Sequence, residues 1–224
     1  MSIIIANSNA LHMVVEEEVS RLYPTHVIHE KEELNLLVLE EMNPKFIFFL
    51  HWSWIIPKEI FDKYNCVVFH MTDVPYGRGG SPLQNLILRG FKETKISALK
   101  VQEGVDSGPV FLKRGLSLAG SAQEIFIRAG KIMGEMIKQI VDENPFPIPQ
   151  QGVGTTFKRR RPEESNIEAN YYCDLASLYD FIRMLDAPGY PHAFIESNGF
   201  KFEFKNASFS KDGELTAYVR ISEK

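Results

Sequence analysis

The chain has 224 residues, of which 44% are hydrophobic and 24% are charged, and its formal net charge is −4. This length allows one sizeable core and a small appendage, and the composition is that of an ordinary globular protein. Proteins that grip long stretches of phosphate backbone usually carry a broad excess of basic residues, so the charge argues against a nucleic-acid partner.

Cysteine content and hydropathy exclude further classes of protein. Two cysteines, Cys66 and Cys173, cannot form a disulfide framework, and they fit a reducing compartment. The N-terminal segment lacks a basic leader followed by a long apolar run, and no apolar stretch approaches about 18 residues. We therefore expect a cytoplasmic protein without a membrane partner.

Strands and helices are expected to alternate through the first 90 residues. Short, continuous apolar runs predict buried strands, and apolar residues at helical spacing predict helices between them. Ser81 is expected to cap the last of these helices, with Pro82 in its first turn and Gly90 at its end. The expected elements are strand 2–7, helix 10–22, strand 25–30, helix 31–43, strand 45–50, helix 57–64, strand 66–70 and helix 82–89. This alternation predicts an α/β fold, with an open, mostly parallel twisted sheet and helices on both faces.

Two more strands and a long helix are expected next. The strands cover 95–104 and 109–118, and the sequence SAQE from Ser121 to Glu124 matches a capping box at the start of the helix. The inner face of this helix carries Ile125, Ala129, Ile132, Met133, Met136, Ile137, Ile140 and Val141. Core packing explains such a stripe.

Three prolines between residues 145 and 149 predict the end of the first domain. We expect a catalytic domain at 1–150, a linker at 151–166 and a small α+β C-terminal domain at 167–224. The basic run Lys158–Arg161 is expected to be a solvated part of the linker. The C-terminal piece is predicted to contain one helix and three strands, too little for a large core of its own.

Two side chains are candidates for chemistry. Ligands of open parallel sheets bind beyond the carboxyl ends of the strands, and His70 ends the strand 66–70. Asp106 lies on the turn between two later strands, between Gly104 and Gly108. An imidazole and a carboxylate at neighbouring strand ends could meet. A structural histidine and an ordinary turn aspartate are the alternatives.

Other chemistries lack their motifs. His51, His70, Asp73 and Asp106 do not have metal-ligand spacing, so no metal is expected. The G-x-S-x-G elbow of serine hydrolases is absent, and the G-R-G-G stretch is not a phosphate-binding Walker loop.

The segment HMTDVPYGRGGSPLQNLILRG, followed by EGVDSGPV, resembles the folate-dependent formyltransferases, and it is in step with their methionyl-tRNA formyltransferase branch. The matching residues are His70, Thr72, Pro75, Arg78, Gly79, Pro82, Gln84 and Gly90 in the first motif and Gly104, Asp106, Gly108 and Pro109 in the second. The similar layout covers about residues 1–165 and continues past the linker.

This resemblance implies a Rossmann-like formyltransferase fold and transfer of a formyl group from N10-formyltetrahydrofolate to an amine. His70 would donate a hydrogen bond to the oxyanion, and Asp106 would hold the imidazole and help to remove a proton from the amine. The family asparagine two residues before the histidine is Val68 here, so Thr72, Gln84 or a backbone N–H is a candidate for the missing donor. A non-catalytic folate-binding relative is the alternative.

The resemblance also implies binding residues. The folate pocket is expected to include Trp52, Trp54, Ile56, Val101, Glu103, Gly104 and Asp106. Contacts to the acceptor are expected from Thr72, Tyr76, Arg78 and Gly79.

Three acceptors are considered: methionyl-tRNA, a glycinamide ribonucleotide and a nucleotide-linked amino sugar. The chain lacks broad positive surface and a larger C-terminal domain, and no glycine-rich phosphate loop follows the first strand. We therefore expect the sugar-nucleotide N-formyltransferase branch, with a UDP-linked dideoxy amino sugar of the pseudaminic-acid type as acceptor, used in surface glycan synthesis. Methionyl-tRNA or another small amine is the alternative. A homodimer formed through the C-terminal piece is also expected.

Overall fold

The computed structural model describes residues 2–170 and 172–224. The chain divides into two compact units. The first unit contains the chain up to Gly79, Thr94–Leu116 and Phe126–Thr156, and the second contains Gly80–Glu93, Ser117–Ile125 and Phe157–Lys224. The division does not follow the expected boundaries at residues 150 and 167, because two earlier segments group with the C-terminal part. The expected domain assignment stays a prediction.

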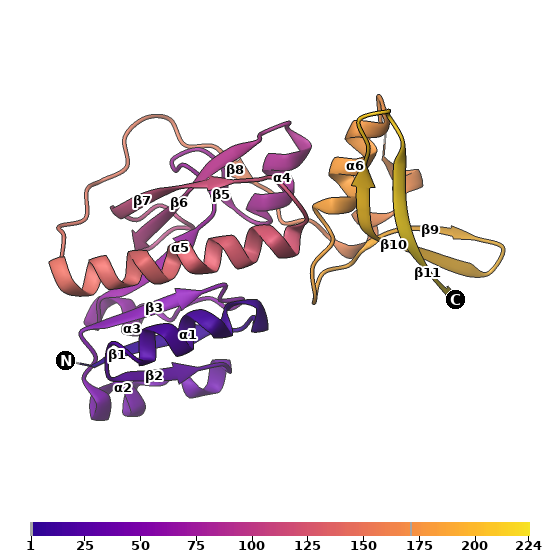
Figure 1. Cartoon of the computed structure of the whole chain (residues 1–224). Coiled ribbons are helices and arrows are strands. Elements are labelled where there is room, and N and C mark those ends of the chain that lie inside the picture. Colours follow the sequence, from indigo (N-terminus) through magenta and orange to yellow (C-terminus); the bar gives the residue numbers. More distant parts are fainter. Residues whose placement is uncertain (1, 171) are drawn as a thin grey trace. The chain divides into compact units, whose positions relative to one another are not determined.

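The first unit is built on a six-stranded sheet (Figure 1). Its strands, in spatial order, are β2 (Thr25–Ile28), β1 (Ile3–Asn7), β3 (Phe46–Leu50), β4 (Cys66–His70), β6 (Glu93–Lys100) and β7 (Val110–Ser117). The pairs β1/β2, β1/β3 and β3/β4 are parallel, and β4/β6 is antiparallel. The predicted α/β fold with a mostly parallel sheet is therefore confirmed.

The central strands form because their apolar runs are covered on both faces. Every residue of β1 and β3 is buried, as a strand sandwiched between helix layers requires. Alternate residues, such as Ile4 and Phe49, belong to a cluster that also contains Leu39 of α2 (Leu36–Met42) and Ile60 of α3 (Lys58–Lys63). These helices cover one face of the sheet.

A second helix pair lies side by side in the first unit. It consists of α1 (Met13–Ser20) and the long helix α5 (Ala122–Glu143), whose first residues belong to the second unit. Gly130 and Gly134 of α5 leave room for the side chain of Val15 on α1. The predicted inner stripe of α5 is buried, except for the half-buried Ile132.

Several helix ends differ from expectation. The predicted helices 10–22 and 31–43 are each divided into a 3₁₀ turn and a shorter α-helix. Asn35 causes the second break, because its side chain accepts a hydrogen bond from the Val38 N–H and so starts α2 afresh. The predicted capping box is confirmed: Ser121 Oγ accepts from the Glu124 N–H at 3.3 Å, and Glu124 Oε2 accepts from the Ser121 N–H at 2.8 Å.

Ser81 occupies the N-cap position of α4 (Pro82–Leu88), as expected, but its side chain makes no capping hydrogen bond. Its φ is 48°, and its hydroxyl accepts a hydrogen bond from the Arg160 N–H at 3.0 Å. The side chain therefore ties the start of α4 to the basic run instead of satisfying the first turn of the helix.

The second unit combines α4, α6 (Leu175–Arg183) and a three-stranded antiparallel sheet in the order β11-β10-β9 (Figure 1). The strands are β9 (Ala193–Ser197), β10 (Phe200–Phe209) and β11 (Leu215–Glu223). Buried polar groups join the segments: Gln84 donates to the Met184 carbonyl, and Arg183 donates to the carbonyls of Leu118 and Gly120. The predicted small α+β C-terminal domain is confirmed as a sheet with one helix.

The expected linker has structure of its own. It contains the short strand β8 (Thr156–Phe157), which pairs with β5 (Arg78–Gly79), and a 3₁₀ turn at Pro162–Ser165. The basic run is only partly solvated, because Arg160 is half-buried beside the Phe181 ring. Burial lowers the pKa of Arg160 from its usual value. Among the described residues, no helix is both long enough and apolar enough to cross a membrane.

Candidate functional site

His70 occupies the carboxyl end of β4, near the middle of the sheet, and only 6% of it is exposed. The neighbouring strands β3 and β6 hold β4 on both sides. His70 Nδ1 lies 3.3 Å from Asp106 Oδ2, so the structure brings the two candidate side chains together.

Asp106 reaches His70 from the turn that follows β6. Its φ is 48°, in the left-handed region that non-glycine residues seldom adopt and that costs them about 1–2 kcal/mol. Its carboxylate is also held from the other side, because Oδ2 accepts a hydrogen bond of 2.8 Å from the Gly79 N–H. The turn therefore aims one carboxylate oxygen at both the imidazole and the loop after β4.

Both nitrogens of the His70 ring face oxygen acceptors. Nε2 lies 2.8 Å from the Gly77 carbonyl oxygen, which can only accept, so Nε2 carries the proton of that hydrogen bond. Nδ1 faces the Asp106 carboxylate. The ring is thus held between the loop after β4 and the turn after β6.

The expected acceptor-binding residues lie on the loop after β4, with different exposure. Thr72 is fully buried, and its hydroxyl donates a hydrogen bond of 3.4 Å to the Gly77 carbonyl, which helps to hold the loop. Tyr76 is half-buried, and the Gly79 N–H contacts Asp106. Arg78 donates through Nε and Nη2 to Gln150 Oε1, at 3.1 and 2.7 Å. Their binding roles stay a prediction.

An apolar wall lies on the same face of the sheet as His70. Val68 shares this face because it precedes His70 by two residues on the same strand. Trp52, Ile56 and Val101 are half-buried and, like Val68, pack on the cluster beneath. The Trp52 ring also meets Trp54, with centroids 4.8 Å apart. Half-exposed apolar side chains of this kind fit one side of a flat heterocycle.

The remaining residues expected at the folate pocket contribute backbone. Glu103 and Gly104 are exposed, and their carbonyls accept hydrogen bonds from the Ser107 hydroxyl at 3.0 and 3.1 Å. Gly108 allows close backbone packing within the protein, since a Cβ there would lie 1.7 Å from the Lys100 carbonyl oxygen. The assignment of all these residues to the folate stays a prediction.

The missing asparagine donor has no direct replacement among the side chains expected to supply it. Val68 adds apolar surface to the wall. Gln84 lies in the second unit and donates to the Met184 carbonyl, and the Thr72 hydroxyl has no exposed surface. A backbone N–H is the candidate that remains.

Two residues of the site were missed by the sequence analysis, because they lie in the proline- and glycine-rich stretch that predicted a domain exit. Gln150 Nε2 donates to the carbonyls of Asp106 and Gly108, each at 2.8 Å. Thr155 Oγ1 accepts from the Gly77 N–H at 2.8 Å, and the Thr155 carbonyl accepts from the Arg78 N–H at 2.9 Å. No local pattern distinguishes these residues from those of a flexible connection.

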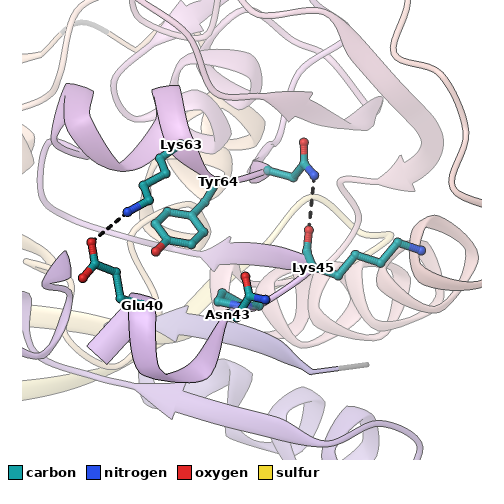
Figure 2. A pocket seen from close by; sticks show the side chains of 7 residues that line it. Glu40, Asn43, Lys45, Lys63 and Tyr64 are labelled. Atoms are coloured by element: carbon teal, nitrogen blue, oxygen red, sulfur yellow. Dashed lines mark hydrogen bonds and ion pairs between the residues drawn. The ribbon is translucent and has the colours of Figure 1, made fainter. Parts of the chain in front are cut away.

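A separate polar pocket of about 390 Å³ lies at the opposite edge of the same sheet (Figure 2). It is lined by residues that precede β3 and β4, including Asn43, Lys45 and Tyr64. An ion pair of 2.7 Å joins Lys63 to Glu40 at one side of it. Since ligands of such sheets bind at the carboxyl edge, this pocket is not the candidate site.

Metal-binding and thiol chemistry find no support in the described residues. No group of three or more potential ligands gathers among residues 2–170 and 172–224. Both cysteines are free, and burial raises the pKa of the Cys66 thiol to about 12, so it is no nucleophile.

Comparison with known proteins shows similarity along the whole chain. The family model described as "Methionyl-tRNA formyltransferase, C-terminal domain" matches residues 162–222. A solved structure named methionyl-tRNA formyltransferase from Clostridium thermocellum is 49% identical, with a TM-score of 0.95 and 100% coverage of both chains. The methionyl-tRNA formyltransferase of Ehrlichia ruminantium (strain Welgevonden) is 26% identical over 92% of this chain and 67% of its own length.

These relatives contradict two expectations about the acceptor. The expected amino-sugar acceptor and the expected absence of a nucleic-acid partner are wrong, because relatives matching nearly all of this chain are named for a tRNA substrate. A structure titled as a likely sugar N-formyltransferase, from Mycobacterium tuberculosis, covers 100% of this chain and 97% of its own. It is only 16% identical, with a TM-score of 0.70, and this similarity shows the fold alone.

One structure that shares the fold contains a folate. HypX from Aquifex aeolicus was solved in complex with tetrahydrofolic acid. It shares the fold, at 19% identity and a TM-score of 0.75 over 95% of this chain and 39% of its own. With identity of 49% to a formyltransferase over its full length, this chain belongs to the formyltransferase family and is an enzyme that transfers a formyl group.

Proposed function

We propose that the protein formylates the amine of methionyl-tRNA. The observation that carries this choice of acceptor is the 49% identity to a methionyl-tRNA formyltransferase with full coverage of both chains. The match of residues 162–222 to the C-terminal domain of the same enzymes supports it independently of the catalytic motifs.

His70 and Asp106 are proposed to act on the two reacting groups. The amine nitrogen bonds to the formyl carbon, the bond from that carbon to folate N10 breaks, and the amine proton ends on N10. His70 Nε2 would exchange the Gly77 carbonyl for the formyl oxygen, which gains negative charge as the amine attacks. Asp106 would accept the amine proton and hold the imidazole through Nδ1.

The apolar wall is proposed to hold the folate beside His70. Trp52, Ile56 and Val101 offer half-buried apolar surface on the face where His70 lies, and Val68 extends it. The folate supplies the formyl group. The wall orients the ring system and keeps water from the reacting carbon.

The basic run is proposed to contact the tRNA backbone. The exposed members of this run are Lys158, Arg159 and Arg161. They lie directly before residues 162–222, which match the C-terminal domain of methionyl-tRNA formyltransferases. A polyanion gains affinity from such a local group of cations even when the whole chain has a net charge of −4.

Transfer of a radiolabelled formyl group tests the proposal. The purified chain should move the label from N10-formyltetrahydrofolate to methionyl-tRNA, and not to free methionine at the same concentration. Labelling of free methionine at the rate of methionyl-tRNA, or no labelling of methionyl-tRNA, would contradict the proposed acceptor.

A further inference from the structure

Gln150 connects the two segments that hold the catalytic pair. Its Oε1 accepts two hydrogen bonds from Arg78, on the loop after β4. Its Nε2 donates to the carbonyls of Asp106 and Gly108, on the turn after β6. An amide has two acceptor and two donor positions, so every one is used. All four residues belong to the first unit.

The turn that carries Asp106 needs such support. Asp106 has a φ of 48°, and a non-glycine residue persists in this region only where its surroundings fix it. The Gln150 amide fixes the carbonyl of Asp106 itself and that of Gly108, two residues on. The other side-chain hydrogen bonds of the turn lie within it: Gln102 donates to the Ser107 carbonyl at 3.3 Å, and the Ser107 hydroxyl donates to carbonyls of residues 103 and 104.

The loop on the other side of His70 depends on the same stretch of chain. The Gly77 N–H donates to Thr155 Oγ1, and the Gly77 carbonyl accepts from His70 Nε2. Gln150 holds the next residue, Arg78, by its guanidinium. The side chains of Gln150 and Thr155 therefore hold the segments on both sides of the catalytic pair.

We propose that Gln150 is a positioning residue for formyl transfer, acting through the backbone of Asp106. This inference rests on the proposed function. By holding the Asp106 and Gly108 carbonyls, the amide keeps the Asp106 carboxylate 3.3 Å from His70 Nδ1. Gln150 does not itself touch the reacting atoms.

The variant Gln150→Glu separates the two functions of the amide. A glutamate keeps an oxygen acceptor for Arg78 but removes both donors and places an oxygen beside two carbonyls. Misplacement of a catalytic group by about 1 Å can cost about 10²-fold in rate, so we expect kcat to fall by about 10- to 100-fold. KM for methionyl-tRNA should change by less than about 3-fold, because a glutamate still accepts from Arg78 and no group proposed to contact the tRNA is removed.

Two comparisons identify the route of the effect. In an Asp106→Asn background, Gln150→Glu should lower kcat by less than about 3-fold, because the group that it positions is already absent. The matched control is Gln151→Glu, which adds the same charge at the adjacent exposed residue and should leave kcat unchanged. Additive losses in the double variant, or an equal loss in the control, would overturn the positioning role.

Amide hydrogen exchange provides a readout that does not depend on the acceptor. Gln150→Glu should speed exchange in residues 101–110, whereas Gln151→Glu should not. If the wild-type chain fails to formylate methionyl-tRNA, the proposed function fails, and the exchange result still tests the support of the turn. The inference would be wrong if residues 101–110 of the Gln150→Glu variant exchanged at the wild-type rate. It would also be wrong if the wild-type chain were active and the variant had the same kcat.

Discussion

At the scale of single residues, His70 and Asp106 are held before any substrate arrives. Each makes a contact to the other and a second contact to the loop after β4, through the Gly77 carbonyl and the Gly79 N–H. Catalytic groups fixed in this way lose little freedom in the transition state. Binding of the substrate has only to displace the Gly77 carbonyl from His70.

Val68 brings no hydrogen-bond donor to the site. The family asparagine at this position would share the stabilisation of the oxyanion, but a valine side chain has no donor. The structure uses Val68 as part of the apolar wall instead. Beside that wall the His70 imidazole can donate a hydrogen bond, as can the Trp52 indole N–H, which is buried and has no partner.

His12 should make the first unit sensitive to acid. It is 1% exposed, and burial, followed by the charge of His51, lowers its pKa from 6.5 to about 3. The unfolded chain binds a proton at this side chain below pH 6.5, and the folded chain does not until about pH 3. Proton binding at His12 therefore leaves the free energy of unfolding unchanged above pH 6.5. As the pH falls below 6.5 it lowers this free energy, by about 2 kcal/mol at pH 5.

Urea unfolding at pH 7.5 and pH 5, followed by tryptophan fluorescence, measures this loss. Both tryptophans, Trp52 and Trp54, lie in the first unit with His12, so the signal reports the relevant transition. The variant His12→Gln should reduce the difference between the two pH values by about 2 kcal/mol. The exposed His26 offers the control His26→Gln, and equal pH dependence in both variants would refute the assignment.

At the scale of elements, the turn between β6 and β7 is fixed by close backbone contact. A Cβ at Gly108 would lie 1.7 Å from the Lys100 carbonyl oxygen, and the Lys100 N–H donates to the Pro109 carbonyl at 2.8 Å. Backbone cannot give way as a flexible side chain can, so Gly108→Ala should displace the turn that carries Asp106. We expect a loss of about 1–3 kcal/mol in stability and at least about 10-fold in kcat.

Thermal melts and steady-state rates of two glycine variants check this prediction. Gly115→Ala on β7 is the matched control, since a Cβ there would meet nothing within 4 Å. If Gly108→Ala behaves like Gly115→Ala in both measurements, the backbone contact does not constrain the turn.

The elements that the sequence predicted correctly are those with strong local signals. The buried strands, the capping box at Ser121 and the stripe of α5 follow from hydrophobic pattern and capping chemistry. Ser81 stands at the start of α4 as expected, but its hydroxyl accepts from the N–H of Arg160, which is distant in sequence, and not from the first turn of the helix. Local pattern carries no information about such a contact.

The residues of the site also differ in whether a local sequence signal points to them. The contact between His70 and Asp106 could be expected, because His70 ends a strand and Asp106 lies on a glycine-flanked turn between two strands. Gln150 and Thr155 could not, since their importance comes from hydrogen bonds to residues more than 40 positions away. A proline- and glycine-rich stretch looks like a linker whether or not its side chains brace a catalytic loop.

At the scale of the whole molecule, average charge was a poor guide to the acceptor. The net charge of −4 led to a wrong expectation that no nucleic acid is bound. A sum over the chain does not register a local group of exposed cations such as Lys158, Arg159 and Arg161. Binding to phosphates depends on the local group, because salt screens charges farther apart than about 10 Å.

Removal of these three cations should weaken tRNA binding without affecting chemistry. With Lys158→Gln, Arg159→Gln and Arg161→Gln combined, we expect KM for methionyl-tRNA to rise by about 10-fold at physiological salt. The slope of log KM against log salt concentration should fall by about 2–3, roughly one for each phosphate that the variant no longer neutralises. The value of kcat at saturating tRNA should stay within about 2-fold.

Steady-state kinetics over a range of salt concentrations provides the measurement. The control replaces Lys31, Lys131 and Lys138, three exposed lysines of the first unit, by glutamine. An equal rise of KM in both triple variants would mean that the basic run has no special part in tRNA binding.

Single-turnover rates of formyl transfer to methionyl-tRNA test most directly whether His70 and Asp106 carry out the chemistry. The rates are compared for the wild-type chain and for the variants His70→Asn and Asp106→Asn, each saturated with N10-formyltetrahydrofolate. If His70 and Asp106 act together on the reacting groups, both variants should be slower by at least about 100-fold while their melting temperatures stay near that of the wild type. A rate within about 3-fold of the wild type in either variant would contradict the assignment of chemistry to this pair.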